Sequence, residues 1–305
     1  MNLGYACINT ELNKMKITTN RSMIKRTFQS KGLPYASELS LKNSKDLLKI
    51  LEWNVRNDIR FFRLSSDLFP WSSEYALSDL PDFDEIKCVL SESGSYAKEN
   101  DIRITTHPGP FNVLCSPRSD VVEKTIKDLD CHAEIFDLMG LDESHYAKIN
   151  IHVGGAYGDF ISTSKRWVSG FQRLSEAAKA RLTLENDDKS SMWSVKDLYD
   201  LIHADTGVPI VFDYHHHKFC TGGLGEREAL EMALSTWNGI TPVVHYSQSR
   251  SEEKNDPKIR PQAHSDSYWE AFDLYGNVAD VMLECKLKEQ GLFKMKELLT
   301  DRIYK

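Results

Sequence analysis

The stretch VPIVFDYHHH, residues 208–217, decides the fold class of this chain. Val208–Phe212 is a short apolar run of the kind that forms a buried strand, and it ends on Asp213 and a row of three histidines. Carboxylates and imidazoles are metal ligands. A strand that ends on such side chains is typical of α/β proteins, in which the active site lies at the carboxyl ends of parallel strands.

The same arrangement recurs along the sequence. Ile102–Thr106 leads into His107, Ala147–Ile151 into His152, Leu182–Leu184 into Glu185, Pro242–Val244 into His245, and Val281–Leu283 into Glu284. Stretches with helical spacing lie between these runs, which indicates strands that alternate with helices. We therefore predict the α/β class and a (β/α)₈ TIM barrel, in which the strand ends converge on one mouth.

The length of the chain suits one domain. A barrel of about 250 residues plus extensions fits 305 residues, and the sequence shows no internal repeat or long linker. We expect a single TIM-barrel domain over residues 1–305, with a core of about 1–295 and a short C-terminal tail over 296–305.

The remaining elements are predicted from residue spacing and from Pro and Gly. We expect strands over Leu3–Ile8 and Ile59–Leu64, and a long basic loop over the barrel mouth from about Asn13 to Ser37. Helices are predicted over Asp46–Asn57, Phe83–Glu99, Asp120–Met139, Lys165–Lys179, Ser194–His203 and Glu226–Thr236, and near Tyr268–Leu274.

Composition indicates an ordinary globular protein, with 41% hydrophobic and 27% charged residues. No apolar stretch approaches the roughly 18 residues of a membrane span, and the start shows no signal-peptide pattern. The six cysteines form no C-x-x-C pair, which favours a reducing, intracellular setting. We expect no membrane partner and a monomer. The expected location is cytoplasmic in a prokaryote and nuclear in a eukaryote, and it stays open for a virus.

The net charge of −7 argues at first against a nucleic-acid partner. Three divalent ions would, however, add about six positive charges where a phosphate would bind. Basic residues also cluster locally, at Lys14, Lys16, Arg21, Lys25, Arg26 and Lys31, and again at Arg250, Lys254, Lys258 and Arg260. Such clusters contact phosphates or simply face solvent, so the global charge does not decide the partner.

The convergence of the strand ends predicts a polynuclear metal site. Buried carboxylates and imidazoles at one rim repel or desolvate one another unless cations neutralise them. Mixed His and carboxylate ligands suit Mn²⁺, Zn²⁺ or Fe²⁺. Glu185, central in barrel order, is the natural bridge between two ions, a geometry that suits phosphoryl transfer. Spacing alone does not choose between His215, His216 and His217 as the ligand beside Asp213.

Ordered sequence blocks carry a family resemblance. They are LGYACIN (3–9), TTNR (18–21), RLSSDLFP (63–70), HPG (107–109), HVGGAYG (152–158), LEND (184–187), DYHHH (213–217), HYSQ (245–248), ECK (284–286) and KEQ (288–290). Because these blocks occur in this order along the chain, the sequence resembles the UV damage endonucleases. These are ATP-independent nicking enzymes of an excision repair pathway. The resemblance implies a barrel like that of endonuclease IV with three divalent ions. Mn²⁺ is expected first, with Mg²⁺, Zn²⁺ or Co²⁺ as alternatives.

The resemblance also implies roles for the ligands. His107, His152 and Glu185 correspond to the set around one ion, and Glu185, Asp213, His245 and Glu284 to the set around a second. His216 corresponds to the histidine that serves the third ion together with His264, which leaves His217 as an outer neighbour.

Family members extrude a damaged dinucleotide from the duplex. The residues that the resemblance places at the lesion or the DNA are Tyr5, Asn9, Arg21, Pro110, Phe111 and Tyr157. Tyr5 is alternatively a core aromatic residue. Relatives carry Gln-Tyr where this chain has Pro110-Phe111, so the apolar wedge is kept and a hydrogen-bonding partner is lost. Relatives also carry a lysine at the position of Val243 and a histidine at that of Asp67.

The resulting hypothesis is a metal-dependent hydrolase that nicks UV-damaged double-stranded DNA. The nick would lie 5′ to a cyclobutane dimer or 6-4 product, with abasic sites as further candidates, and leave 3′-hydroxyl and 5′-phosphate ends. Glu185 would act in catalysis, and Lys286 or Lys288 would add positive charge at the phosphate. The main rival is a sugar isomerase or epimerase on the same barrel, with one or two metals and a closed pocket. A second rival is a lesion-binding protein that does not cleave.

Overall fold

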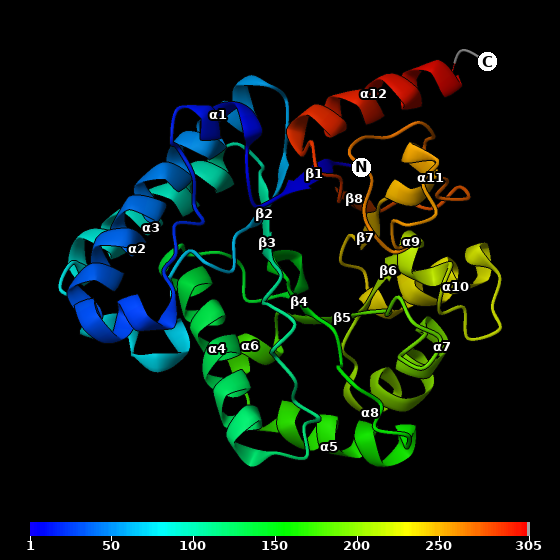
Figure 1. The fold of residues 1–305 in the computed structure, drawn as a ribbon, viewed down its shortest axis with the longest axis horizontal. Helices are drawn as coiled ribbons and strands as arrows, with labels where there is room; N and C mark the ends of the chain where they lie inside the picture. Colours follow the sequence, from blue (N-terminus) through cyan, green and yellow to red (C-terminus); the bar gives the residue numbers. More distant parts are fainter. Residues whose placement is uncertain (304–305) are drawn as a thin grey trace.

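Eight parallel strands pair in chain order and close into a barrel in the computed structural model, which describes residues 1–303 (Figure 1). They are β1 (Leu3–Ala6), β2 (Phe61–Leu64), β3 (Arg103–Thr106), β4 (Ile149–Ile151), β5 (Leu182–Glu185), β6 (Ile210–Asp213), β7 (Val243–Tyr246) and β8 (Asp280–Leu283). Most of their residues are buried, which explains the short continuous apolar runs in the sequence. The predicted TIM barrel is confirmed.

Side chains along each strand alternate between the barrel interior and the surrounding helices. An apolar layer inside the barrel is formed by Ala6, Phe61, Val211, Trp237, Val243 and Met282. Asp213, His245 and Glu284 each stand two residues beyond a member of this layer, so their side chains share its face and reach the mouth. Asp213 and His245 are also direct partners across β6 and β7. Because side chains alternate along each strand, the polar residues at these strand ends all face the mouth of the barrel.

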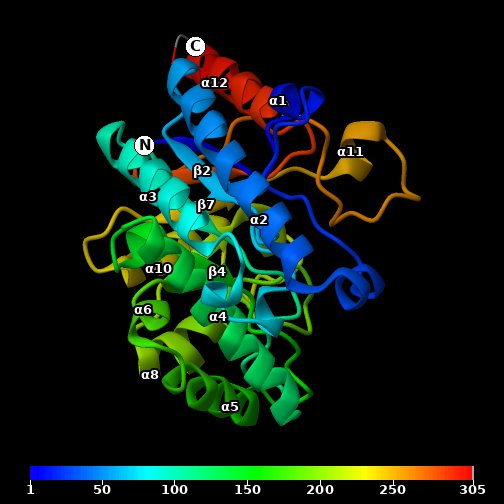
Figure 2. The same ribbon diagram turned by 90° about the vertical axis from the view of Figure 1, so that its left-hand side faces the viewer.

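Helices surround the strands (Figures 1 and 2). They are α1 (Thr10–Lys14), α2 (Lys25–Arg56), α3 (Phe83–Glu99), α4 (Ser119–Leu138), α5 (Phe160–Gln172), α6 (Glu176–Lys179), α7 (Val195–Leu198), α8 (Ala204–Thr206), α9 (Tyr214–His217), α10 (Glu226–Leu234), α11 (Arg250–Lys254) and α12 (Glu289–Ile303). A π-helical segment, Tyr199–His203, joins α7 to α8. Short 3₁₀ turns lie at Ser72–Glu74, Leu77–Asp79, His145–Ala147 and Ser235–Trp237. None of the helices among residues 1–303 is long and apolar enough to cross a bilayer.

The predicted loop from about Asn13 to Ser37 is wrong in its second half. Helix α2 begins at Lys25, and only the backbone at Gly32, with φ of 62°, interrupts it. Pro34 follows this break within the first turn of the next helical stretch, where a missing N–H costs nothing. Met23 and Phe28 pack against the core and hold the segment in place. Gly and Pro were therefore markers of a kink, not of a loop.

The helix predicted near Tyr268–Leu274 is also wrong, because these residues have irregular backbone. Tyr268 and Phe272 are buried, and the Tyr268 hydroxyl donates to the carbonyl of Tyr246 at 3.2 Å. Tertiary packing, not helical periodicity, accounts for this aromatic spacing. At the C-terminus, α12 includes residues 296–303 of the predicted tail, and residues 304 and 305 lie outside the described range.

The first and last helices are joined at the edge of the barrel. Glu289 at the start of α12 is fully buried, and its carboxylate accepts the backbone N–H groups of Thr10 and Glu11 at 2.8 and 3.0 Å. Thr10 also donates its hydroxyl to this carboxylate. These bonds satisfy the free N–H groups at the first turn of α1. The loop that leaves β1 is thereby fixed to the element that follows β8.

Candidate metal centre

Three overlapping groups of His, Asp and Glu side chains meet at the mouth of the barrel. They are His107–His152–Glu185, Glu185–Asp213–His216 and Asp213–His245–Glu284, with the ligand atoms of each group within 4.8 Å of one another. Glu185 and Asp213 each belong to two of the groups. Both are buried, as is His245, whereas the other members lie closer to solvent. Seven of the eight predicted ligands thus converge.

Glu185 occupies the centre of this arrangement. Its Oε2 lies 3.2 Å from Nε2 of His107 and 3.0 Å from Nδ1 of His245. Its Oε1 lies 3.3 Å from Nδ1 of His216 and 3.9 Å from Nε2 of His152. Each carboxylate oxygen therefore faces a different pair of imidazoles. This arrangement would allow Glu185 to ligate two cations.

Several polar atoms at the centre are buried without a hydrogen-bond partner. They are Oδ2 of Asp213 and the Nδ1 atoms of His152 and His245. His245 Nδ1 is close to Oε2 of Glu185 and lies 3.2 Å from Oε1 of Glu284, yet it is not oriented to form a hydrogen bond with either. Buried polar groups are nearly always hydrogen-bonded. A shared cation among these atoms would satisfy them, so the residues fit a metal centre.

The pKa values of two groups in the metal-free site also indicate that positive charge is favoured there. Burial raises the pKa of Asp213 to about 6, and the nearby carboxylates of Glu185 and Glu284 add to this shift. Burial alone would lower the pKa of His152, but the carboxylates of Glu185 and Asp187 raise it to about 9. Without cations, the site therefore retains protons on groups that would serve as ligands.

His216 and His264 lie side by side, with ring centroids 6.4 Å apart. His216 Nδ1 lies 2.9 Å from the carbonyl of Asn186, and His264 Nδ1 lies 2.7 Å from that of Glu284. These contacts help to orient both rings. His264 itself belongs to none of the three groups. The two histidines thus lie next to each other at the edge of the cluster, and their shared role at a third ion stays a prediction.

The other two histidines of the triplet belong to none of the three groups, although the His215 ring lies 5.9 Å from that of His264. His215 and His217 are buried, and the ring of His217 packs 5.3 Å from that of Phe212. Helix α9 explains the division, because Asp213 caps it by accepting the N–H of His216 at 2.7 Å. The first helical turn therefore brings only the central histidine back over the strand end.

A polar layer beneath the ligands supports Glu185. Asn150, two residues before His152 on β4, donates its amide to Oε2 of Glu185. Thr183 in turn donates to the Asn150 carbonyl oxygen at 2.8 Å. Lys148 lies one step deeper, and its Nζ is 3.4 Å from Nε2 of His245. Burial lowers the pKa of Lys148 well below its ordinary value, which favours the uncharged amine.

The sequence reasoning missed two charged residues at the mouth. Arg63 on β2 forms an ion pair with Glu284, so its guanidinium places a positive charge next to the candidate ligands. Asp187 lies 3.2 Å from Nδ1 of His152. Both residues stand in the blocks that carried the resemblance, and each lies within two residues of the end of its strand. Lys286, in contrast, is exposed and does not line the cavity at the metal centre.

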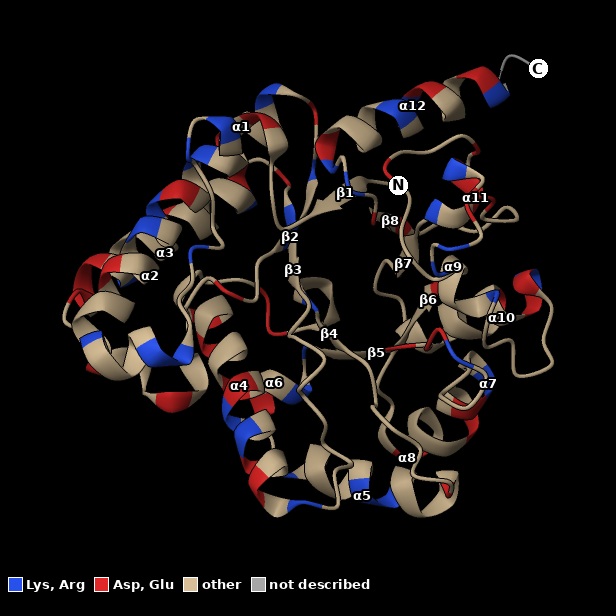
Figure 3. Cartoon of the chain, in the orientation of Figure 1, with Lys and Arg blue, Asp and Glu red and all other residues tan. Residues whose placement is uncertain are grey.

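That cavity has a volume of about 590 Å³. The ligands His107, His152, Glu185, His216, His264 and Glu284 line it, together with Arg63 and Lys189. The rest of the surface mixes both signs of charge over the outer helices (Figure 3). An anion entering the cavity would therefore meet two cationic side chains in addition to any bound metal.

Three of the predicted DNA-binding residues are engaged inside the protein. Tyr5 is 0% exposed and donates to Asn54 at 2.7 Å, while Asn9 donates to the Tyr5 hydroxyl at 3.0 Å and caps α1. Arg21 pairs with Asp46 at 2.6 Å. Tyr5 is thus a core residue, and none of the three side chains lines either of the cavities at the mouth. Their roles at the DNA stay predictions.

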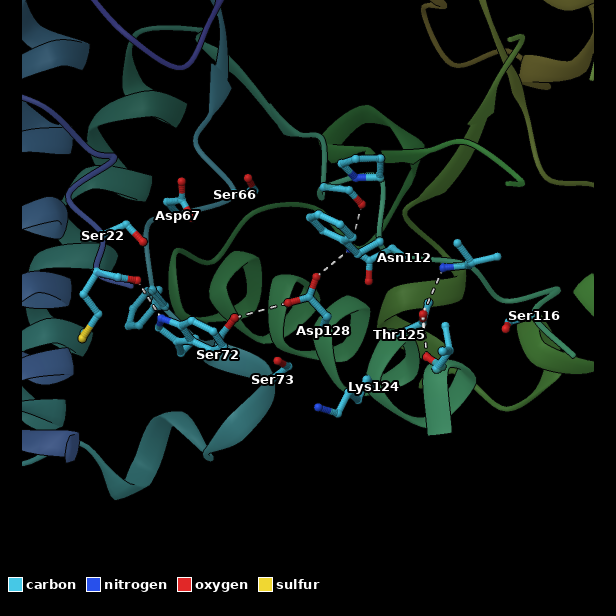
Figure 4. Close-up of a pocket in the computed structure, with 18 of the residues that line it drawn as sticks. Ser22, Ser66, Asp67, Ser72, Ser73, Asn112, Ser116, Lys124, Thr125 and Asp128 are labelled. Carbon is cyan, nitrogen blue, oxygen red and sulfur yellow. Dashed lines mark hydrogen bonds between the residues drawn. The ribbon is translucent and has the colours of Figure 1, made fainter. Parts of the chain in front are cut away.

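The other three predicted DNA-binding residues lie at the surface next to the metal centre. Phe111 is 86% exposed and Tyr157 is 54% exposed. Together with Pro110 they line a second cavity of about 810 Å³, which also includes Asp67. Figure 4 shows its polar floor, where Asp128 accepts hydrogen bonds from Asn112 at 2.8 Å and Ser72 at 3.3 Å. Pro110 lines both cavities, so Phe111 stands at the boundary between them.

The chain is similar over almost its whole length to proteins of one known family. The family model described as UV-endonuclease UvdE matches residues 1–304. A UV-damage endonuclease from Schizosaccharomyces pombe is 38% identical over 304 residues, which cover 96% of this chain and 50% of that protein. A UV DNA damage endonuclease from Clostridium perfringens is 32% identical over 302 residues, which cover 96% of this chain and 69% of that protein. The chain thus spans about half the length of the S. pombe relative.

Solved structures give the same result. The crystal structure of SacUVDE superimposes with a TM-score of 0.82 at 30% identity and covers 99% of this chain and 98% of that one. D-psicose 3-epimerase from Clostridium cellulolyticum H10 reaches a TM-score of 0.53 at 13% identity, covering 93% of this chain and 85% of that one. The second likeness extends to the barrel fold alone and does not favour the sugar isomerase alternative.

Proposed function

The chain belongs to the UV-endonuclease UvdE family, and we propose that it is a metal-dependent endonuclease that nicks UV-damaged double-stranded DNA. We place the nick 5′ to a cyclobutane dimer or a 6-4 product, with 3′-hydroxyl and 5′-phosphate ends. We further propose that the protein acts as a monomer inside the cell. Three divalent ions, with Mn²⁺ first among the candidates, complete the proposed site.

One observation carries the proposal: two buried carboxylates are each shared between adjacent ligand groups. Glu185 and Asp213 link the three groups into one cluster, and no single ion could use all their members. Among the described residues, the cluster contains no cysteine, which agrees with ions that prefer nitrogen and oxygen ligands. A multinuclear site of this kind suits hydrolysis of a phosphodiester.

The proposed reaction divides its tasks among the side chains. Bound ions would lower the pKa of a water molecule and stabilise charge on the phosphate. The amide of Asn150 donates to Oε2 of Glu185 and would hold this carboxylate in place as a ligand of the bound ions. Arg63 and Lys189 offer positive charge to the phosphate oxygens in the cavity. A water oxygen adds to phosphorus, the bond from phosphorus to the 3′ oxygen breaks, and a proton passes to that oxygen.

The lesion is proposed to lie beside Phe111. This side chain is exposed next to the metal cavity, so it can stack on a base or fill the gap left by an extruded one. Unstacking a damaged step costs less than unstacking an intact one. Preference for damaged DNA would then come from the deformability of the lesion. Pro110 restricts the backbone conformation of this loop and has no N–H group to donate a hydrogen bond.

The test uses an end-labelled duplex that carries one cyclobutane thymine dimer. Purified protein is incubated with it in Mn²⁺, with and without a chelator, and an undamaged duplex runs in parallel. We expect a chelator-sensitive nick immediately 5′ to the dimer and none in undamaged DNA. Glu185→Gln should reduce the rate by more than about 100-fold, because it removes the shared charge.

A matched substitution controls for charge and for folding. Glu143 is exposed and precedes β4, at the end of the barrel opposite the mouth, so Glu143→Gln should cut at the wild-type rate. A damaged duplex that stays intact with metal-loaded wild-type protein would contradict the proposed function.

A further inference from the structure

Lys148 is a lysine enclosed inside the barrel. It directly precedes β4, its side chain is 0% exposed, and its Nζ lies 3.4 Å from Nε2 of His245. Among residues 1–303, no carboxylate oxygen lies within 4.0 Å of this nitrogen. The imidazole of His245 is thus the polar group that the amine meets.

A structural role in the barrel does not explain why Lys148 is buried. Arg103, the other basic side chain in the same region, is equally buried but pairs with Asp280 at 3.0 Å and donates to the carbonyls of Thr241 and Tyr146. Lys148 has no such set of partners. An amine that leaves water for a single weak contact costs free energy of folding. A residue retained at such a cost points to a role in function.

The contact with His245 supplies that role. His245 lies on β7, and its Nε2 faces Nζ of Lys148 at 3.4 Å. The other nitrogen, Nδ1, then faces Glu185 at 3.0 Å and Glu284 at 3.2 Å. The ring has two polar atoms, and Lys148 engages the one that is not directed at the ligand cluster. Outer contacts of this kind fix the orientation of ligating histidines in metal sites.

We propose that Lys148 is a positioning residue, which holds the ring of His245 so that Nδ1 completes the Asp213–His245–Glu284 group. The inference rests on the proposed metal chemistry of the site. It predicts two opposite effects of removing the amine. Metal binding should weaken, because His245 is no longer held. The metal-free protein should be as stable as the wild type or more stable, because a poorly satisfied polar group has left the interior.

The test measures both quantities in Lys148→Met, which keeps most of the apolar stem. Mn²⁺ affinity is followed by calorimetry and by electron paramagnetic resonance of free Mn²⁺, and stability by urea unfolding in chelator. We expect the weakest Mn²⁺ site to lose about 10- to 100-fold in affinity. Lys127→Met is the matched control. Lys127 is exposed on α4 and lines neither cavity at the mouth, so this variant should keep the wild-type Mn²⁺ affinity.

A double-mutant cycle with His245→Ala separates positioning from a general effect. If Lys148 acts through His245, then Lys148→Met should cause no further loss of Mn²⁺ affinity in the His245→Ala background. Additive losses would overturn the inference. So would wild-type Mn²⁺ affinity in Lys148→Met, or metal-free protein that is less stable than wild type in both Lys148→Met and Lys148→Leu. Wild-type protein that binds no Mn²⁺ would overturn the metal chemistry together with this inference, whereas the other failures leave the proposed function intact.

Discussion

Nδ1 of His245 lies 3.0 Å from Oε2 of Glu185, and the two atoms are not oriented to form a hydrogen bond. Both side chains are buried, so water does not satisfy them. An imidazole and a carboxylate held this close without a hydrogen bond would suit two ligands of a cation. The strand ends thus preorganise the site before any ion arrives.

Metal uptake should release protons, and its affinity should fall with falling pH. The pKa of His152 is raised to about 9, so at pH 7.5 its ring carries a proton that a cation must displace. The pKa of Asp213 is raised to about 6, so a second proton competes below that pH. We expect Mn²⁺ affinity to drop at least about tenfold per pH unit from 8 to 6 and more steeply below 6. Calorimetry in buffers of different ionisation enthalpy measures the protons released, and uptake without proton release at pH 7.5 would show the prediction to be wrong.

The amide of Asn150 should matter for metal binding although it touches no ion. Asn150→Ala removes the donor to Oε2 of Glu185, which frees the carboxylate to rotate. We expect Mn²⁺ affinity to fall by about 10- to 100-fold. Thr183→Val removes only the contact that fixes the Asn150 amide, and it should have a smaller effect in the same direction. Equal Mn²⁺ affinity in the wild type and both variants would refute the role of this layer.

Phe111→Ala should impair recognition of DNA without affecting the fold. The side chain is 86% exposed, so its removal leaves the melting temperature unchanged. Stacking of a base on an aromatic side chain contributes about 1–3 kcal/mol, so affinity for a dimer-containing duplex should fall about 5- to 150-fold. Ile161→Ala, at a 53% exposed position on α5, is the control. Similar losses in both variants would indicate a general surface effect.

Tyr5→Phe should lower stability and leave the chemistry intact. The Tyr5 hydroxyl donates to Asn54 of α2 and accepts from Asn9 outside the barrel interior, and its loss leaves two buried amides unsatisfied. We expect the free energy of unfolding to fall by about 1–3 kcal/mol. The rate of nicking by the folded variant should equal that of the wild type. A loss of nicking at unchanged stability would instead place Tyr5 at the lesion, as the family resemblance had suggested.

The ligand cluster could be predicted from sequence because it depends only on local rules. Short apolar runs fix the strands, and the period of two fixes which residue at each strand end faces the mouth. His107, Glu185 and Glu284 follow directly from these rules. The choice of His216 within its triplet did not, since it depends on one turn of helix capped by Asp213. The resemblance supplied that choice, and the structure places the residue in the cluster.

What escaped prediction depends on contacts between distant parts of the chain. The buried state of Tyr5 requires Asn54, which lies 49 residues away in sequence. Lys148 and His245 are separated by 97 residues, and their contact has no local signal. The irregular backbone near Tyr268 likewise depends on its packing against Tyr246. Sequence patterns within a segment predict which face of a helix or strand is buried. They do not predict which distant residue that face will contact.

The link between Glu289 and the first turn of α1 has a consequence for how the protein is made. These groups are separated by 279 residues, and β1 likewise pairs with β8 near the end of the chain. During synthesis, the first strand therefore leaves the ribosome long before its partner exists. Until β8 emerges, β1 has an unpaired edge that can bind other strands. The order of translation, and not only the stability of the finished barrel, thus sets when this protein is most at risk of aggregation.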